Sequence, residues 1–326
     1  MSKPVAKNRF QGYGKRIFSN PEMVTLLAFL GLCLLMTMFS DRFLTVANLS
    51  NVARQMSVNA ILAVGMTFAI LTGGIDLSVG STMALTGTLM AGAMVHWGWH
   101  PVLAVAFGLF VGVILGLGNG SFVAYAKLPA IIVTLAMMEA ARGLALLYTG
   151  GYPLSGLPQS FQTLGRGFLF DNPVIPIPAV IMLATYAVAY VILNHTPLGR
   201  YVYAIGDNEE AVHLSGVNTR VVKMVVYAIS GFTAALSGLI LTSRLMSGQP
   251  NAGVGFELDA IASVVLGGPD IAGGRGSIIG TLIGALTMGV LNNGLNLMGV
   301  SPYVQRVIKG LIIVGAIYVS SRRKEQ

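Results

Sequence analysis

The chain has 326 residues, of which 54% are hydrophobic and only 10% are charged. A soluble domain carries about a quarter charged residues, so this composition excludes an ordinary water-soluble protein and favours one whose solvent is lipid. The net charge of +8 does not indicate a nucleic-acid partner, because the basic residues gather mainly at the ends of apolar runs, as membrane topology signals do.

The chain begins with a basic tail, residues 1–21, followed by a long apolar run. No small-residue cleavage site follows that run, so we interpret it as a retained first span rather than a signal peptide. A helix that crosses a bilayer needs about 20 apolar residues, and about ten segments approach that length. The predicted spans are 22–40, 55–73, 78–96, 101–125, 129–149, 174–194, 223–243, 257–268, 277–298 and 303–320.

These spans predict an all-α fold, a single polytopic transmembrane helical bundle over residues 22–320 that contains broken helices. The eighth span, 257–268, is too short to cross alone and is predicted to be a half-helix. When the spans alternate, most of the 20 basic residues fall on one side, which places both termini, including the tail 321–326, in the cytoplasm. We therefore expect a multi-pass protein of the bacterial inner membrane, surrounded by lipid.

Glycines recur at every fourth position in two of the spans, which leaves a bare backbone stripe on one helix face and allows close helix packing in lipid. The first stripe is Gly108, Gly112, Gly116 and Gly120, and the second is Gly276, Gly280 and Gly284.

Two segments share the order Gly-Gly, one residue, Asp and an aliphatic residue. Because Gly-Gly is a poor helix interior and Asp is a good N-cap, the pattern predicts a broken helix or hinge; two ordinary tight turns explain it equally well. An even number of spans separates the segments, so any internal repeat would be parallel. The first segment contains Gly73, Gly74 and Asp76, and the second contains Gly267, Gly268 and Asp270.

The cytoplasmic segment 195–222 contains a predicted helix of about two turns, capped by Asp207 or Asn208 and ended by Gly216. Helices that rest on lipid headgroups favour Lys and Arg, whereas this one is acidic, so docking of a soluble partner is favoured over lipid contact. The predicted docking residues are Gly206, Asp207, Asn208, Glu209, Glu210, Ala211, Leu214 and Gly216.

Amide side chains share a face in the second and ninth spans, where they suit sugar hydroxyls because an amide both donates and accepts hydrogen bonds. Hydrogen bonding between helices is the alternative, and the amides can serve both roles. The predicted substrate-pathway residues are Asn51, Gln55, Asn59, Asn292 and Asn296.

Charged groups within or beside the spans are few. Glu139 and Arg142 are one helical turn apart and are expected to pair; Asp76, Glu139 and Asp270 are expected to be the only acidic groups in the membrane. Four arginines map to the outer side, where they either meet the acidic lobes of a binding protein or anchor to lipid headgroups. These are Arg42, Arg54, Arg166 and Arg244.

The docking segment, the Gly-Gly-Ile-Asp-Leu-Ser-Val-Gly segment (73–80) and the glycine-rich segment 265–281 together resemble the permeases of ribose-type ATP-binding-cassette (ABC) sugar importers. The resemblance runs from about residue 40 to the end. It departs at Asp207, where the family often has glycine, so this chain adds a negative charge to the expected docking surface.

The resemblance implies a monosaccharide cargo, ribose first and D-allose next, carried by alternating access. It also implies three partners: a second permease chain, identical or paralogous, a cytoplasmic P-loop ATPase that docks at 204–218, and a periplasmic sugar-binding protein that supplies most of the selectivity. No P-loop, catalytic cluster or metal-ligand spacing occurs in the sequence. We therefore expect no enzymatic activity, metal or cofactor in this chain, with ATP used by the partner; the alternative is a stand-alone, ion-coupled secondary sugar transporter.

Overall fold

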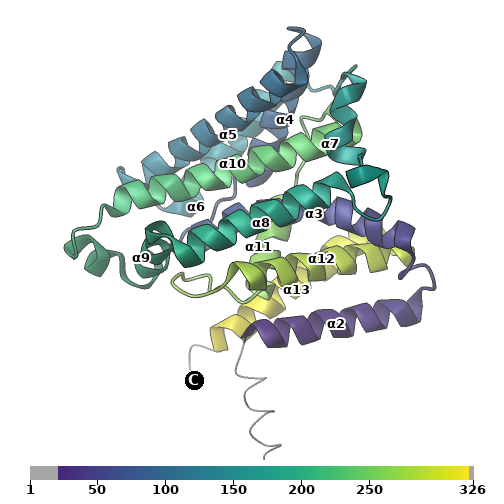
Figure 1. The fold of residues 1–326 in the computed structure, drawn as a ribbon. Helices are drawn as coiled ribbons and strands as arrows, with labels where there is room; N and C mark the ends of the chain where they lie inside the picture. Colours follow the sequence, from purple (N-terminus) through teal and green to yellow (C-terminus); the bar gives the residue numbers. More distant parts are fainter. Residues whose placement is uncertain (1–20, 323–326) are drawn as a thin grey trace, which may run out of the picture.

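The computed structural model describes residues 21–322, and both predicted tails lie almost entirely outside this range. The described chain is an all-α bundle with only two short strands, which confirms the predicted fold class (Figure 1). Within the described chain, seven helices are individually long and apolar enough to cross a membrane. The protein is therefore a multi-pass membrane protein.

Each of the ten predicted spans coincides with one helix. Most boundaries agree within a few residues, but the second span starts earlier than predicted because Thr45 caps it and its polar first turns lower the local hydropathy. The helices are α2 (Pro21–Phe39), α3 (Val46–Leu71), α4 (Val79–Val95), α5 (Pro101–Ala124), α6 (Ala130–Thr149), α8 (Ile177–His195), α10 (Thr219–Leu245), α11 (Phe256–Leu266), α12 (Ile278–Leu297) and α13 (Pro302–Arg322).

The shorter elements mark the two ends of the bundle. Helix α9 (Pro197–Leu214) lies at the same end as the start of α2 and the end of α13, which we call the cytoplasmic end (Figure 1). The opposite, outer end carries α7 (Thr163–Arg166), η1 (Gln159–Gln162) and η2 (Leu169–Asp171). There β1 (Leu154–Ser155) pairs antiparallel with β2 (Ser247–Gly248), with Leu154 opposite Gly248.

Helices α3 and α10 form the centre of the bundle, whereas α2 lies at its edge. In the most apolar window of each helix, 83% of the α3 residues and 67% of the α10 residues are buried, against 6% for α2. The first glycine stripe permits this core, because a Cβ at Gly112 or Gly116 would overlap the backbone of Gly231 or Tyr227 in α10. The stripe therefore sets how closely α5 approaches α10.

The second glycine stripe is shorter than predicted. Gly280 and Gly284 lie against Gly267 and Ser263 at the end of α11, so they bring α12 close to that half-helix. Gly276 precedes α12 and has a φ of +142°, so it belongs to the preceding turn rather than to the stripe.

The half-helix α11 spans only 11 residues, about 16 Å, which is too short to cross a bilayer. The non-helical turn segment 249–255 covers the remaining depth: Gly248 packs beside Ala91 near the outer end of α4, and Gly253 packs beside Gly80 at its start. Non-helical backbone is tolerated at membrane depth only when protein surrounds it and satisfies its polar groups.

Arg142 of α6 satisfies part of this turn backbone. Its Nη1 donates to the carbonyl oxygens of Pro250, at 2.5 Å, and Ala252, at 2.7 Å. The predicted pair with Glu139 is wrong, because Glu139 is exposed and the described ion pairs do not include it. Arg142 therefore pairs with the backbone carbonyl groups of Pro250 and Ala252 inside the bundle, and not with the Glu139 carboxylate.

Both predicted helix breaks are present, between α3 and α4 and between α11 and α12. The prediction that aspartates cap the following helices is wrong. Ser277 holds the capping position of α12 and accepts a hydrogen bond from the Gly280 amide at 3.0 Å, while Ser78 precedes α4. Asp76 and Asp270 instead accept bonds from backbone amides two residues later, so each stabilises the turn within its break.

Candidate functional site

A cavity of about 260 Å³ lies in the outer half of the bundle, between α3, α11, α12, α13 and the end of α10. Four of the five predicted pathway amides line it: Gln55 and Asn59 from α3, and Asn292 and Asn296 from α12. The fifth, Asn51, is exposed and is not among the lining residues; its Oδ1 accepts a hydrogen bond from Gln55 at 3.1 Å. The four-residue helical spacing thus brings most of the predicted amides to one cavity, which we call the outer cavity.

The same amides also connect helices. Asn59 Nδ2 donates to Asp259 Oδ2 in α11 at 3.3 Å, and Gln305 Nε2 of α13 donates to Asn296 Oδ1 in α12 at 2.8 Å. The interhelical alternative therefore holds for Asn59 and Asn296, and it coexists with their position on the cavity wall.

An ion pair that the sequence analysis missed lies in this wall. Lys309 of α13 lies 2.9 Å from Asp259 of α11, with 23% and 8% of their side chains exposed. The expectation that Asp76, Glu139 and Asp270 are the only acidic groups in the membrane is therefore wrong. The signal was present, because each partner falls inside a predicted span and a charge there requires a neutralising neighbour. Their separation of 50 positions in the sequence concealed the pairing.

Three polar atoms around the outer cavity are buried without a hydrogen-bond partner among residues 21–322. They are Asn59 Oδ1, Asn292 Oδ1 and Arg244 Nη1. A buried polar group left unsatisfied costs about 1–3 kcal/mol, and native proteins satisfy nearly all of them with protein, water or ligand. All three atoms have almost no accessible surface, so they are unsatisfied within the packed wall of the outer cavity rather than on its surface.

Three of the four predicted outer arginines converge at the outer end. Arg166 Nε donates to the Arg244 carbonyl oxygen at 2.6 Å, and the Arg54 guanidinium lies 4.8 Å from the centre of the Phe168 ring. Arg54 also lies close enough to Arg244 for their charges to repel. Arg42 lies exposed in the turn between α2 and α3. The arrangement gathers positive charge at the outer end of the bundle, and of these arginines Arg244 also lines the outer cavity.

At the cytoplasmic end, the two helix breaks touch. The Gly274 amide donates to the carbonyl oxygen of Leu71, the last residue of α3, at 3.0 Å. Gly206 of α9 packs against both breaks, and a Cβ there would overlap the Leu71 oxygen and the Gly274 nitrogen. Gly273 packs beside Gly73 and Gly206. We call these five residues the coupling junction.

Tyr203 fastens α9 to the second break one turn before the junction. Its hydroxyl donates to the Gly276 carbonyl oxygen at 3.1 Å. Burial raises the pKa of the Tyr203 phenol, and the nearby charge of Glu22 raises it further. The phenol therefore stays protonated and able to donate at physiological pH.

Helix α9 is longer than the predicted helix of two turns. It begins at Pro197 because Thr196 caps it, and it kinks at Asn208, where φ is −157° and ψ is 96°. Asn208 Oδ1 accepts a hydrogen bond from the Ala211 amide at 3.0 Å, so Asn208, rather than Asp207, caps the part after the kink. Gly216, with a φ of +88°, follows the helix end, as predicted.

Most of the predicted docking residues face solvent at the cytoplasmic end. The exposed ones are Asp207, Asn208, Glu209, Glu210, Ala211, Leu214 and Gly216. Leu214 is 80% exposed, which is unusual for a large apolar side chain beside charged neighbours. Gly206 differs from the others, because it packs inward at the coupling junction. Glu209 is also anchored within the chain, since its carboxylate pairs with Lys223 of α10 at 2.5 Å.

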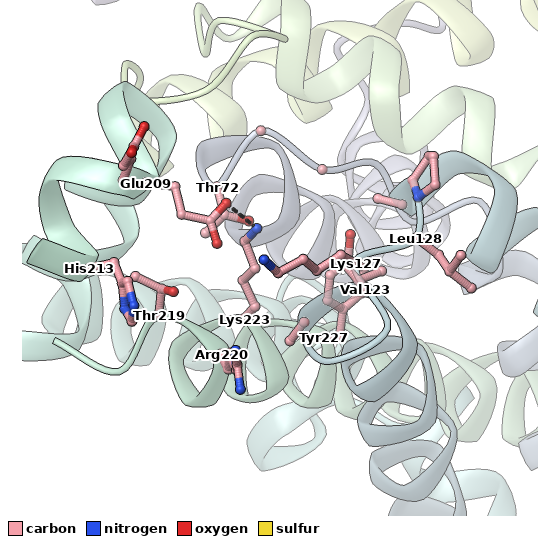
Figure 2. A pocket seen from close by; sticks show the side chains of 16 residues that line it. Thr72, Val123, Lys127, Leu128, Glu209, His213, Thr219, Arg220, Lys223 and Tyr227 are labelled. Atoms are coloured by element: carbon pink, nitrogen blue, oxygen red, sulfur yellow. Dashed lines mark hydrogen bonds and ion pairs between the residues drawn. The ribbon is translucent and has the colours of Figure 1, made fainter.

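A second cavity, of about 670 Å³, opens between this face of α9 and the first helix break (Figure 2). Its wall carries cations from α10 and from the turn between α5 and α6, facing the acidic residues of α9. The labelled lining residues include Thr72, Lys127, Glu209, His213, Arg220, Lys223 and Tyr227. This cytoplasmic cavity places the solvent-facing helix and a membrane helix break on two sides of one space.

The first break is also anchored inside the bundle by Asp76, which is 1% exposed. Its carboxylate accepts hydrogen bonds from the Ser78 hydroxyl at 2.6 Å and from the Ser230 hydroxyl of α10 at 2.7 Å. Asn119 of α5 donates to the Ser78 hydroxyl at 2.9 Å. The break is therefore connected to the central helices, so its movement would be transmitted to them.

Known permeases are similar to this chain over nearly its whole length. Residues 48–317 match the sequence model of a family described as the permease component of branched-chain amino acid transport systems. The ribose import permease of Bacillus subtilis is 48% identical over 314 residues, covering 95% of this chain and 96% of that protein. That of Escherichia coli K12 is 46% identical over 316 residues, covering 95% and 98%.

A xylose transport system permease of Haemophilus influenzae is 35% identical over 343 residues, covering 87% of this chain and 91% of that protein. No solved structure matches the chain.

Proposed function

The chain belongs to the family of permease components described for branched-chain amino acid transport systems, and from this premise we propose that it is the membrane-spanning subunit of an ABC importer for a monosaccharide. Ribose is the favoured cargo, because the relatives at 46–48% identity are ribose import permeases, whereas the xylose permease is 35% identical. D-allose, suggested by the sequence resemblance, is the next candidate. The site of action is the bacterial inner membrane.

The observation that carries the proposal is the coupling junction. Gly206 lies in the same helix as the exposed docking residues and packs on both membrane helix breaks. A force applied to α9 by a soluble partner would therefore reach the ends of α3 and α11 directly. That arrangement suits a permease whose alternating access is driven from outside the chain.

The proposal assigns three partners to three surfaces. A P-loop ATPase docks on the exposed part of α9, where Leu214 supplies an apolar anchor and Glu210 an acidic rim. A periplasmic sugar-binding protein docks at the outer end, where Arg54 and Arg166 would meet its acidic lobes. A second permease chain, identical or paralogous, completes the pathway. This chain performs no chemistry on the sugar, and ATP is hydrolysed by the partner.

One observation favours a second candidate, the stand-alone secondary transporter. Asp76 is a buried carboxylate whose described hydrogen bonds come from serine hydroxyl and amide groups rather than from a cation. Such a group suits proton or sodium coupling. The coupling junction favours the ABC permease, because a secondary transporter requires no exposed docking helix.

The driving force separates the two candidates. We expect proteoliposomes that contain the chain, its ATPase and the binding protein to accumulate ribose only when ATP is present, and to continue when an uncoupler collapses the proton gradient. The control omits the ATPase and should show no accumulation. Uptake that persists without ATP but stops with the uncoupler would overturn the proposal in favour of ion coupling.

A further inference from the structure

The cytoplasmic cavity carries positive charge that the described chain does not neutralise. Its volume is about 670 Å³, and its charged lining residues are Lys127, Glu209, Glu210, Arg220 and Lys223. Lys223 is paired with Glu209 at 2.5 Å, whereas Lys127 and Arg220 belong to no ion pair among residues 21–322. When Glu210 is counted against them and histidine is neutral, the lining retains one net positive charge. The cavity therefore attracts an anion.

The turn between α5 and α6 brings the two unpaired cations together. The Arg220 guanidinium lies 5.6 Å from the centre of the Tyr125 ring, and Tyr125 is two residues before Lys127 in that turn. The Lys127 side chain extends into the cavity (Figure 2). Lys127 has a φ of +53°, a left-handed conformation that is free for glycine but costs stability for lysine. A strained residue that places a cation in a cavity supports a binding role for this turn.

Apolar side chains beside these cations identify the kind of anion. Phe122 and Tyr125 are each 53% exposed and Leu128 is 46% exposed, close to the end of α5. Helix α5 is peripheral, since only 22% of its most apolar window is buried. Exposed aromatic groups at the end of a spanning helix lie at the level of the lipid headgroups, and basic pockets between such helices on the cytoplasmic side bind anionic headgroups. A soluble acidic peptide would use the cations but leave this apolar edge uncovered.

We propose that the cytoplasmic cavity binds the headgroup of an acidic phospholipid, whose phosphodiester pairs with Lys127 and Arg220 and whose acyl chains lie along Phe122 and Leu128. A phosphodiester carries one negative charge, which balances the net charge of the lining, and an arginine fork suits phosphate oxygens. The inference goes beyond the proposed function, because lipid binding requires neither sugar nor ATP.

The position of the cavity gives such a lipid a possible effect on movement inside the chain. Gly73, a member of the coupling junction, lines the cavity together with Glu210 of the docking set. A bound headgroup would therefore fill space between α9 and the first helix break. The lipid would limit how far these two elements approach each other.

The direct test is lipid binding to the full chain in detergent, measured by native mass spectrometry. The chain is titrated with phosphatidylglycerol, with phosphatidylethanolamine of the same acyl chains, and with inorganic phosphate. We expect one tight site for phosphatidylglycerol and no comparable site for the other two. Lys127→Gln and Arg220→Gln should each weaken phosphatidylglycerol binding about fivefold. Arg200→Gln is the matched control, because Arg200 is an exposed arginine of α9 that does not line the cavity.

Several outcomes would overturn the inference. Unchanged binding in both cavity variants, or an equal loss in the Arg200 variant, would place the lipid elsewhere. Equal binding of phosphatidylethanolamine or of inorganic phosphate would refute an acidic lipid as the ligand. The titration is repeated with the ATPase bound, where loss of the tight site would assign the cavity to an acidic group of that partner.

Two further measurements keep these readings separate from other effects. An unchanged thermal unfolding temperature shows that each variant is folded. ATP-driven ribose uptake plays no part in the titrations, so a failed transport assay would refute the proposed function and leave this inference standing.

Discussion

At the scale of single residues, Arg142 makes non-helical backbone tolerable inside the bundle. The turn segment 249–255 leaves the carbonyl groups of Pro250 and Ala252 outside any helical hydrogen-bond ladder, and no water is present in a bilayer core to replace such partners. One guanidinium nitrogen of Arg142 donates a hydrogen bond to the carbonyl oxygen of Pro250 and another to that of Ala252. The charge of Arg142 is thus used structurally, as a donor to backbone, rather than for catalysis or transport.

We expect Arg142→Leu to lower the free energy of unfolding by about 2–3 kcal/mol, because two buried carbonyls lose a charged donor. The measurement is thermal unfolding of the purified chain in detergent, where the midpoint should fall by several degrees. Glu139→Gln is the matched control and should change little, since Glu139 is exposed on the same helix. An equal loss of stability in both variants would mean that Glu139 and Arg142 form an ion pair, which would contradict the structure.

Local patterns at this scale were predictable where they depend on helical spacing or capping. The four-residue spacing of the amides predicted that Asn59 and Asn292 lie on helix faces that share a function, and both line one cavity. Asn208 was one of the two residues predicted to cap the docking helix, and it does so. The pairing of Asp259 with Lys309 was not predicted, because it depends on how α11 and α13 pack and no local rule connects residues 50 positions apart.

At the scale of elements, α9 combines two surfaces in one kinked helix. Before the kink it is packed against the bundle through Gly206 and Tyr203, and after the kink it is exposed and ends beside Leu214. The Glu209–Lys223 pair holds the exposed part against α10. A partner that binds the exposed part therefore acts on an element already attached to the membrane helices.

We expect Leu214→Lys to weaken co-purification of the ATPase about tenfold, because an exposed apolar side chain at a docking surface contributes at least about 1.4 kcal/mol when buried by a partner. The fold should be unaffected, since Leu214 is 80% exposed. Arg200→Gln, an exposed position of the same helix outside the docking set, should leave association unchanged. Full ATPase recovery with the Leu214 variant would show that docking occurs elsewhere.

Each of the ten segments predicted from hydropathy and length coincides with a helix, including the half-helix α11, because these two properties determine which segments enter a bilayer. Sequence reasoning underestimated α9, since the turns before Asn208 are neither apolar enough for a span nor marked by a break. It left residues 249–255 outside every predicted span. The depth of that segment depends on Arg142 and on close packing along α4, which no hydropathy window detects.

At the scale of the whole molecule, both helix breaks lie at the cytoplasmic end, as does α9 (Figure 1). The residues that line the outer cavity belong to the opposite half. Helix α3 ends at the coupling junction, and α11 ends where the second break begins, so both run toward the cytoplasmic end, the orientation that the predicted parallel repeat requires. The contact between the breaks was not predictable, because their sequence similarity carries no information about proximity. The molecule thus separates the half that holds the outer cavity from the end where the two helix breaks meet.

The central claim is that α9 transmits ATP hydrolysis to the helix breaks, and Gly206→Ala tests it most directly. The added Cβ overlaps the backbone of Leu71 and Gly274, so the two breaks must shift. Gly143→Ala is the matched control, since it lies in α6 with no atom within 4 Å of its new Cβ.

The measurement is the number of ribose molecules imported per ATP hydrolysed in proteoliposomes. We predict that the Gly206 variant still assembles and hydrolyses ATP but imports at least tenfold less ribose per ATP, whereas the Gly143 variant matches the unmodified protein. Unchanged import per ATP in an assembled Gly206 variant would contradict the account.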